Sequence, residues 1–159
     1  MDAYQFLKSL NIDYKNYEHN AVFTCQDCEG ITFDMEFIPT KNLVLQDKKK
    51  TALFLVVVPD YKRANLKEIE GILDQKHLSF ASATTLQEKL NITPGSCSLL
   101  NLINLKDKSQ VQVLVDAEIL KNQNVGMHPN RNTATVVFNT KHIKAILNSL
   151  QIKWQEINI

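Results

Sequence analysis

The sequence lacks the features that would place a protein in a membrane or outside the cell. Its longest apolar run, residues 52–59, is far shorter than the roughly 18 residues of a membrane-spanning helix. Residues 1–10 include Asp2 and Lys8 and have no long apolar core, so they do not resemble a signal peptide. The chain has three cysteines, an odd number, which without a secretion signal favours a reducing compartment. These absences predict a cytoplasmic protein with no membrane contact.

Charge imbalance, internal repeats and linkers are also lacking. The chain has 18 Lys and Arg residues against 17 Asp and Glu residues, a net charge of +1, so any contact with nucleic acid must come from a local patch. The 159 residues show no repeat, low-complexity tract or linker, which predicts one domain over residues 1–159. A chain of this length can bury a sizeable core without disulfides.

Hydrophobic periodicity predicts helices and strands in irregular alternation. We expect helices over residues 3–10, 65–73, 84–90 and 141–150, with a short one after Asp116, and N-caps at Ser82 and Thr140. We expect strands over residues 14–18, 41–46, 51–58, 78–81, 111–115, 133–138 and 153–157. The almost wholly apolar segment 53–58 predicts a central strand covered on both faces. Because several strands are joined by hairpins, the expected fold class is α+β, a single domain with a central mixed, mostly antiparallel β-sheet flanked by helices.

The most informative segment is residues 126–135, directly before and into a predicted strand. Gly126 permits backbone conformations and close approaches that a Cβ would forbid, and Pro129 fixes its own φ and restrains His128. Such a loop holds backbone N–H groups and an imidazole in a set geometry, as sites for small polar substrates often do. A tight turn between two strands would use the same residue types.

Five motifs occur together along the chain: Glu18-His19-x-Ala21-Val22-Phe23-Thr24, Lys41-Asn42-Leu43-x-Leu45-x-Asp47-Lys48-Lys49, Leu78-Ser79-Phe80-Ala81-Ser82, Pro94-Gly95-Ser96 and Gly126-x-His128-Pro129-x-x-Asn132-Thr133-Ala134-Thr135. In this order and spacing they resemble the YbaK/prolyl-tRNA-synthetase-associated editing superfamily, over about residues 1–150. The closest similarity is to its free-standing, trans-editing branch. The resemblance implies the editing fold and an enzyme that hydrolyses the ester of wrongly charged tRNA. For this branch the implied substrate is alanine attached to tRNA(Pro), whereas the sister branch prefers cysteine and lacks the Lys-Asn-Leu strand start.

The resemblance also implies roles for individual residues. Lys41 and His128 are the catalytic candidates: Lys41 would hold the terminal phosphate or ribose or stabilise charge near the ester, and His128 would orient water, bind the ribose or act as a general base. Asn42, carried over as substrate-binding, offers a donor and an acceptor next to that cation. The backbone N–H groups of Gly126 to Pro129 would bond the substrate carbonyl. The remaining candidates would brace the loop or contact the terminal adenosine (Asn132, Thr133) or form the walls of the amino-acid pocket (Val22, Phe23, Phe80, Met127).

An aminoacyl ester is already activated, so catalysis requires a positioned water or ribose hydroxyl and a stabilised oxyanion rather than a strong nucleophile. A small pocket would exclude the proline ring by size. For the tRNA we expect a basic track of Lys48, Lys49, Lys50 and Arg131, although solvated hairpin lysines would look the same in sequence. The implied partners are tRNA(Pro) charged with alanine and, as a docking partner, prolyl-tRNA synthetase; no cofactor is implied.

Three other hypotheses remain open. One is a deacylase for cysteinyl-tRNA(Pro), and another is a non-catalytic module that binds tRNA or a synthetase. The third is a zinc site made by His19, Cys25 and Cys28, which lacks the second Cys or His pair of a structural zinc site. The presence of both Lys41 and the Gly126 segment favours an enzyme over a binding module.

Overall fold

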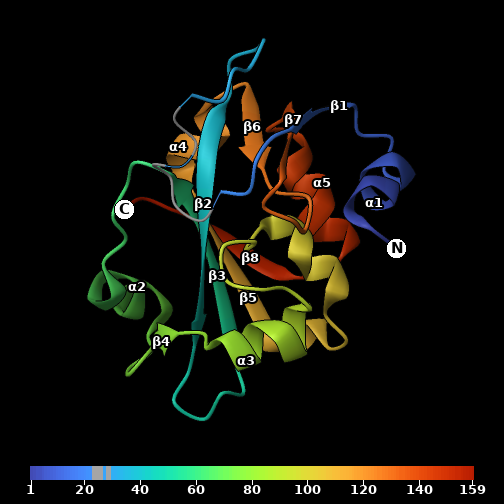
Figure 1. The fold of residues 1–159 in the computed structure, drawn as a ribbon. Coiled ribbons are helices and arrows are strands. Elements are labelled where there is room, and N and C mark those ends of the chain that lie inside the picture. Colours follow the sequence, from blue (N-terminus) through green and yellow to red (C-terminus); the bar gives the residue numbers. More distant parts are fainter. Residues whose placement is uncertain (23–26, 28–29) are drawn as a thin grey trace.

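A computed structural model describes residues 1–22, 27 and 30–159. Its strands are β1 (Tyr14–Glu18), β2 (Ile38–Gln46), β3 (Leu53–Pro59), β4 (Ser79–Phe80), β5 (Val111–Asp116), β6 (Asn124–Met127), β7 (Ala134–Asn139) and β8 (Lys153–Ile157). Its α-helices are α1 (Ala3–Ser9), α2 (Leu66–Leu73), α3 (Ala83–Thr85), α4 (Ala117–Lys121) and α5 (His142–Ser149), and its other helical turns are η2 (Leu86–Leu90), η3 (Leu99–Asn104) and η4 (Lys108–Gln110). Figure 1 shows these elements arranged around one twisted sheet.

The strands follow the order β1-β7-β6-β2-β3-β5-β8, with β4 also paired to β2. Antiparallel pairings join β1 to β7, β6 to β7, β2 to β3 and β2 to β4. Parallel pairings join β2 to β6, β3 to β5 and β5 to β8. Within the described residues the sheet is therefore mixed with an antiparallel majority, and the predicted α+β class is confirmed.

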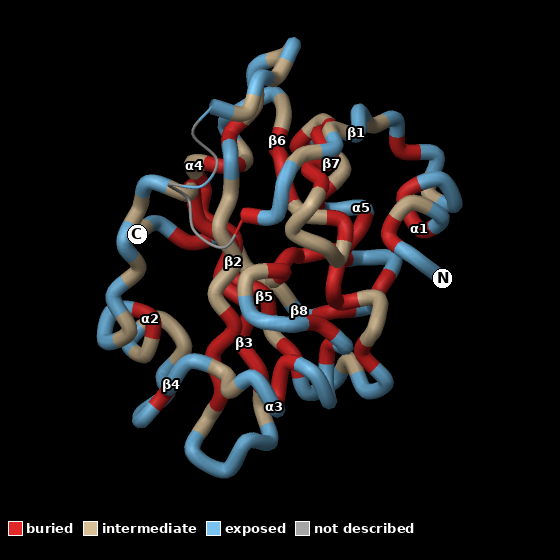
Figure 2. Tube along the Cα trace, viewed as in Figure 1, coloured by how far each residue is buried: buried red, intermediate tan, exposed pale blue. Residues whose placement is uncertain are grey.

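Strand β3 lies at the centre of the hydrophobic core, as its apolar sequence predicts. All of its residues are buried (Figure 2). Leu55 and Val57 point into a large cluster that includes residues of α1, η3 and α5, whereas Val56 and Val58 point into a smaller cluster that includes Ile69 of α2. Because both of its faces are covered, β3 tolerates no polar residue.

Two predicted helix caps are confirmed and one is wrong. Ser82 caps α3 by accepting from the backbone N–H of Thr85, and Asp116 caps α4 by accepting from that of Glu118. Asn65, predicted as the first residue of a helix, instead caps α2. Thr140, however, donates its hydroxyl to the carbonyl of Asn122 at 2.5 Å, and α5 begins at His142 without a side-chain cap. Thr140 therefore fastens the start of α5 to the turn before β6. No helix in the described residues has both the length and the apolar character needed to cross a membrane.

Candidate functional site

Lys41 and Asn42 are neighbours in β2, but the pleat of the strand sends their side chains to opposite faces of the sheet. Side chains alternate between faces along a strand. Val44 belongs to the larger core cluster and Leu45 to the smaller one beside α2. Asn42 therefore shares the face of Val44, and Lys41 shares the face of Leu45. This arrangement corrects the expectation of an amide side chain beside the lysine cation.

One edge of β2 is open in its middle. The other edge pairs with β3 along residues 40–46 of β2. On the open edge, β6 pairs only with residues 38–39 and β4 only with residues 45–46. In the part of the chain that the structure describes, no strand pairs with β2 between these contacts. We call residues 40–43, on this edge, the β2 opening.

Asn42 directs its polar groups toward the β2 opening. The carbonyl of Pro39 accepts from the N–H of Asp60 at 3.0 Å and so faces β3, whereas the carbonyl of Val44 accepts from the N–H of Ala81 at 2.8 Å on the opposite edge. Backbone groups alternate between the two edges of a strand, so the N–H and C=O of Asn42 face the opening. Its Oδ1 is buried and has no hydrogen-bond partner among the described residues.

His128 directly follows β6 and takes the same face of the sheet as Lys41. Strands β2 and β6 are parallel, with Pro39 opposite Gly126, so two residues further along Lys41 and His128 share one face. The Nδ1 atom of His128 lies 2.9 Å from the carbonyl oxygen of Ala134. Because a carbonyl only accepts, Nδ1 carries the proton, and in the neutral ring Nε2 holds the lone pair.

The surroundings of His128 favour its neutral form. Burial lowers the pKa of the imidazole below its ordinary value, the hydrogen bond to Ala134 raises it in part, and the charge of His19 lowers it again. The ring is therefore uncharged at neutral pH. A neutral imidazole whose Nε2 holds a lone pair can accept a proton, as a general base must.

His19 belongs to the site, although sequence reasoning considered it only as a zinc ligand. Its ring centroid lies 6.1 Å from that of His128. Its Nδ1 is 2.8 Å from the carbonyl oxygen of Asn20, and its Nε2 is 2.9 Å from the hydroxyl of Thr135. Both ring nitrogens are thus engaged within the fold, and Cys25 and Cys28, the other two residues of the zinc hypothesis, lie outside the described residues. The signal in the sequence was the position of His19 in the first family motif.

A hollow of about 640 Å³ adjoins His19. It is lined, among the described residues, by Glu18, His19, Asn20, Ala21, Asp27, Gly30, Ile31 and Thr32. Small and polar side chains dominate this lining. The hollow is therefore the candidate site for the amino-acid part of a substrate.

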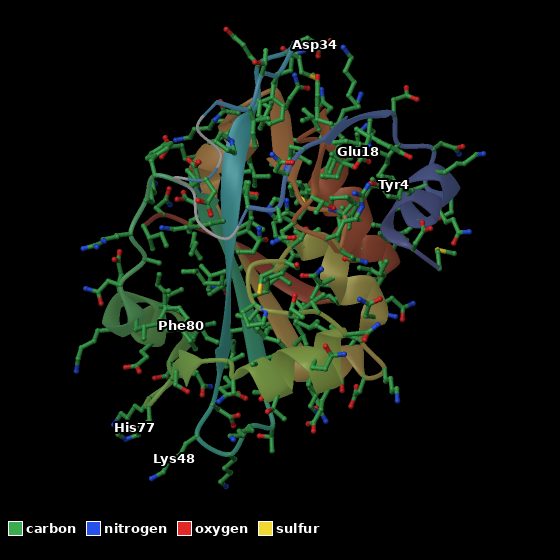
Figure 3. The ribbon with its side chains drawn as sticks, in the orientation of Figure 1. Tyr4, Glu18, Asp34, Lys48, His77 and Phe80 are labelled. Atoms are coloured by element: carbon green, nitrogen blue, oxygen red, sulfur yellow. The ribbon has the colours of Figure 1, made fainter. Side chains whose placement is uncertain are left out.

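Arg131 clamps the loop after β6 to the N-terminal part of the chain. Its guanidinium bonds both carboxylate oxygens of Glu18, at 2.8 and 2.5 Å, and the hydroxyl of Tyr4 at 2.7 Å (Figure 3 shows Tyr4 and Glu18). The hydrogen bonds from Arg131 and, to a smaller extent, from Asn16 lower the pKa of Glu18 to about 2. The cation is therefore engaged inside the fold, which argues against the tRNA contact predicted for it.

The next residues of this loop brace the segment that carries His19. The side-chain amide of Asn132 donates to the carbonyl of Val22 at 2.9 Å, and the Val22 N–H donates to the Asn132 carbonyl at 3.0 Å. The carbonyl of Thr133 accepts from the N–H of His19 at 3.0 Å. Val22 is buried beneath this link and Pro129 is buried in the loop. Of the two roles predicted for Asn132 and Thr133, the contacts favour bracing.

Gly126 and Met127 are part of strand β6, which the sequence analysis did not predict. A Cβ at Gly126 would lie 2.4 Å from the ring of Phe37, so the close approach that this glycine permits is to Phe37. Met127 is 3% exposed and belongs to the larger core cluster, on the face opposite His128. The structure therefore gives both residues packing roles, and the substrate contacts predicted for Gly126 and Met127 stay predictions.

Another predicted pocket wall, Phe80, does not join this site. Phe80 is 56% exposed on β4, where it pairs with Leu45, and Figure 3 shows it far from Glu18. The prediction for Phe23 falls outside the described residues. Among the wall candidates that the structure describes, Val22 lies beside the loop that carries His128.

Lys41 lies within β2, whereas the hairpin lysines lie in the turn that follows it. The charge of Lys41 acts on Asp60, whose pKa is raised by burial and lowered in part by Tyr61 and Lys41. Lys48, Lys49 and Lys50 are exposed at the tip of the β2–β3 hairpin (Figure 3). These three remain candidates for a tRNA contact, at the end of β2 away from His128.

Three comparisons with known proteins agree on one family. The model of the aminoacyl-tRNA editing domain matches residues 19–146. The chain is 33% identical over 151 residues to the prolyl-tRNA editing protein ProX of Acetoanaerobium sticklandii, covering 92% of each chain. It is 33% identical over 134 residues to the prolyl-tRNA synthetase associated domain-containing protein 1 of Danio rerio, covering 83% of this chain and 72% of that protein.

The fold is also found among solved structures. A protein provisionally described as a trans-editing enzyme for prolyl-tRNA synthetase superposes with a TM-score of 0.72 at 14% identity, covering 98% of this chain and 93% of that chain. At this identity the likeness concerns the fold alone. It agrees with the α+β architecture described above.

Proposed function

The chain belongs to the aminoacyl-tRNA editing domain family, and from this premise we propose that it is a trans-editing deacylase that hydrolyses alanyl-tRNA(Pro). The whole chain, residues 1–159, would act as one editing domain. The similarity to ProX supports tRNA(Pro) as the carrier. The similarity to a synthetase-associated protein supports prolyl-tRNA synthetase as a docking partner.

One observation carries this proposal: a neutral His128 lies on the same face of the sheet as Lys41, where β6 leaves the edge of β2. The bond from Nδ1 of His128 to Ala134 fixes the tautomer that leaves Nε2 as an acceptor. Burial keeps the ring neutral by lowering its pKa. Lys41 supplies a cation on the same face, and Asn42 supplies a backbone N–H directed to the opening. A base, a cation and a fixed donor are the groups that ester hydrolysis requires.

In the proposed reaction the oxygen of a water molecule bonds to the ester carbonyl carbon while Nε2 of His128 takes the water proton. The ribose 2′-hydroxyl of the substrate would help to hold this water. The N–H of Asn42 would donate to the carbonyl oxygen as it gains negative charge, and Lys41 would stabilise charge at the ribose or its phosphate. The bond between the carbonyl carbon and the ribose oxygen then breaks, and that oxygen receives the proton from His128.

Selectivity for alanine would follow from size. The hollow beside His19 is lined by small and polar residues and lies next to the segment that ends at Val22. At about 640 Å³ the hollow as a whole would hold the side chain of either alanine or proline, so exclusion of the proline ring would have to come from close contacts made within it, as in a second sieve when binding alone cannot discriminate. Cysteine is only slightly larger than alanine, so cysteinyl-tRNA(Pro) is the competing substrate.

The test is deacylation of tRNA(Pro) charged with alanine, cysteine or proline in parallel reactions. We expect rapid loss of alanine with proline retained. Preferred loss of cysteine would assign the chain to the sister activity. If no ester is hydrolysed while tRNA(Pro) still binds, the chain is a binding module. The variant Lys41→Ala should lose hydrolysis while keeping tRNA binding, and equal hydrolysis by both proteins would remove Lys41 from the mechanism.

A further inference from the structure

The loop between His128 and Ala134 is also held from the core, by Asn101 of η3. The side-chain amide of Asn101 donates to Oδ1 of Asn130 at 2.7 Å. Asn101 is 1% exposed, whereas Asn130 is partly buried in the loop. We propose that Asn101 is a positioning residue for the candidate site, acting through Asn130 on His128, an inference that rests on the proposed deacylase function.

The helical turn that carries Asn101 is fixed within itself and to the core. The Oδ1 atom of Asn101 accepts from the backbone N–H of Ser98, and the hydroxyl of Ser98 accepts from the N–H of Leu100 at 3.2 Å, so the two side chains cap η3 together. Leu99, Leu100 and Leu102 of this turn are almost wholly buried in the larger core cluster. Asn101 therefore reaches the loop from a firm base.

The hydrogen bonds of Asn101 determine which end of its amide faces the loop. A backbone N–H can only donate, so the oxygen of Asn101 faces Ser98 and its NH2 group faces Asn130. Asn130 must then present its own oxygen to Asn101. The roles of both amides in this link are set by the cap of η3, and the link holds Asn130 in one orientation.

Asn130 lies at a sharp turn of the backbone. Its φ is 64°, in the left-handed region that asparagine adopts more readily than most residues. This turn lies between His128 and Ala134, whose carbonyl oxygen accepts from Nδ1 of His128 at 2.9 Å. A shift of the turn would strain that bond, which sets the tautomer of His128 and the direction of its Nε2.

A second side-chain link to the loop is more exposed than the one from Asn101. The side chains of Arg131 and Glu18, which form an ion pair, are 39% and 61% exposed, so water weakens their attraction. The amide of Asn101 is shielded from water, where a hydrogen bond is electrostatically stronger. The buried link is therefore the firmer of the two, and we assign the positioning role to it.

Asn130→Gly removes the acceptor of this link and leaves a residue that adopts a positive φ without steric cost. We expect kcat for alanyl-tRNA(Pro) to fall by about tenfold to a hundredfold with KM little changed, because a misplaced His128 weakens the transition state rather than binding. Asn91→Gly is the matched control: Asn91 is exposed, has a φ of 54° and accepts from the side-chain amide of Gln87 at 2.9 Å. Equal kcat in the two glycine variants would overturn the positioning role and leave the deacylase function standing.

Further substitutions test whether Asn101 acts through Asn130. Asn130→Asp keeps an acceptor and tolerates a positive φ, so at alkaline pH it should keep most of the wild-type kcat. Asn101→Ala should be slow, and the double variant with Asn130→Gly should be no slower than the slower single variant, because both changes remove the same link. If Asn130→Asp is as slow as Asn130→Gly, or if the two losses multiply in the double variant, the proposal fails.

A pH titration separates positioning from a general weakening of the fold. Burial holds the pKa of His128 below its ordinary value. A loosened loop admits water, so in Asn130→Gly this pKa should rise and the acid limb of kcat/KM should move to higher pH. Glycine adds no charge, so His19, whose charge also lowers this pKa, and Lys41 on the same face act equally in both glycine variants.

NMR of the histidine rings measures the same pKa without any substrate. We expect the pKa of His128 to be higher in Asn130→Gly than in the wild type and unchanged in Asn91→Gly. An unchanged pKa in Asn130→Gly would contradict the link between the loop anchor and His128. If the wild type hydrolyses no ester, the proposed function fails, and a pKa that rises in Asn130→Gly alone would still support the link.

Discussion

Strands β2 and β3 pair with each other along most of their length, yet they differ in burial and in the pairing of their other edges. β3 has neighbours on both edges, β2 and β5, and all of its residues are buried. β2 is buried at its C-terminal end but only partly buried from Thr40 to Leu43, where its outer edge opens. Thr40, Lys41 and Asn42 lie in that stretch, whereas its other polar residue, Gln46, is buried at the C-terminal end.

Within this pair of strands, β3 serves mainly the stability of the fold, and the middle of β2 belongs to the candidate site. β3 contributes apolar burial to both core clusters, so its residues are constrained by packing. In the middle of β2 the outer backbone edge pairs with no described strand, and under the proposed function its residues would be constrained by the substrate they bind. Substitutions in the two strands should therefore damage different properties.

The largest effect should come from the core side of the comparison. Leu55→Ala in β3 removes a side chain that is 3% exposed, and we expect a loss of about 2–5 kcal/mol in the free energy of unfolding. Urea denaturation measures this loss. Below the transition the folded fraction should deacylate at the wild-type rate, and a large fall in its specific rate would show that β3 shapes the site.

Lys41→Ala should have the opposite effect, a loss of activity with little loss of stability. Because Lys41 lies on the face with His128, we expect deacylation to fall by about 10²–10³-fold, the typical cost of removing one electrostatic group from an active site. The urea midpoint should hardly move. Lys153→Ala, an exposed lysine in the outer strand β8, is the matched control and should retain activity. If Lys41→Ala and Lys153→Ala lost deacylation activity to a similar extent, the loss would not be specific to β2.

Gly126→Ala tests the strand that bounds the β2 opening. The added Cβ would meet the ring of Phe37 at 2.4 Å, and we expect a loss of about 1–3 kcal/mol from overpacking. The double variant with Phe37→Ala should lose less than the sum of the two single variants, because the clash is gone. Strict additivity in thermal unfolding would contradict the contact.

The pH dependence of kcat/KM should report the neutral state of His128. Its pKa is lowered by burial, and the neutral form is the proposed base, so activity should stay level through neutral pH and fall only below the ordinary histidine pKa of about 6.5. Below the pKa of His128 the fall should be about tenfold per pH unit. The same shift destabilises the fold as pH falls from about 6.5, because the unfolded chain binds the proton more readily. His128→Asn should be much slower and lack this acid limb, and an acid limb centred above 6.5 would exclude His128 as the buried base.

The features that could be predicted from the sequence were mostly those set by residues close together in the chain. The apolar run of β3 and the caps at Ser82 and Asp116 depend on local pattern, and all were found as expected. Strand β6 escaped prediction because four residues that include a glycine show no usable periodicity. The cap predicted at Thr140 was wrong because its hydroxyl donates to the carbonyl of Asn122, which is distant in sequence, and so does not cap the next helix.

The candidate site shows the same division. The motifs placed Lys41, Asn42 and His128 in one region, but which face each side chain takes follows from the strand's pairing and packing, which local sequence does not set. Arg131 looks like a tRNA contact in sequence because its partner, Glu18, lies 113 positions away. Contacts of that separation cannot be read from one sequence without the fold.

The β2 opening has a consequence for the behaviour of the chain in concentrated solution. Unpaired strand edges normally invite other strands, which leads to association and aggregation. Here β6 closes one end of the open edge and β4 closes the other, so only a few residues of β2 lack a partner strand among the residues that the structure describes. A strand from another molecule would find too short a stretch to pair with. The same two strands that leave room for a substrate therefore protect the chain from adding copies of itself at that edge.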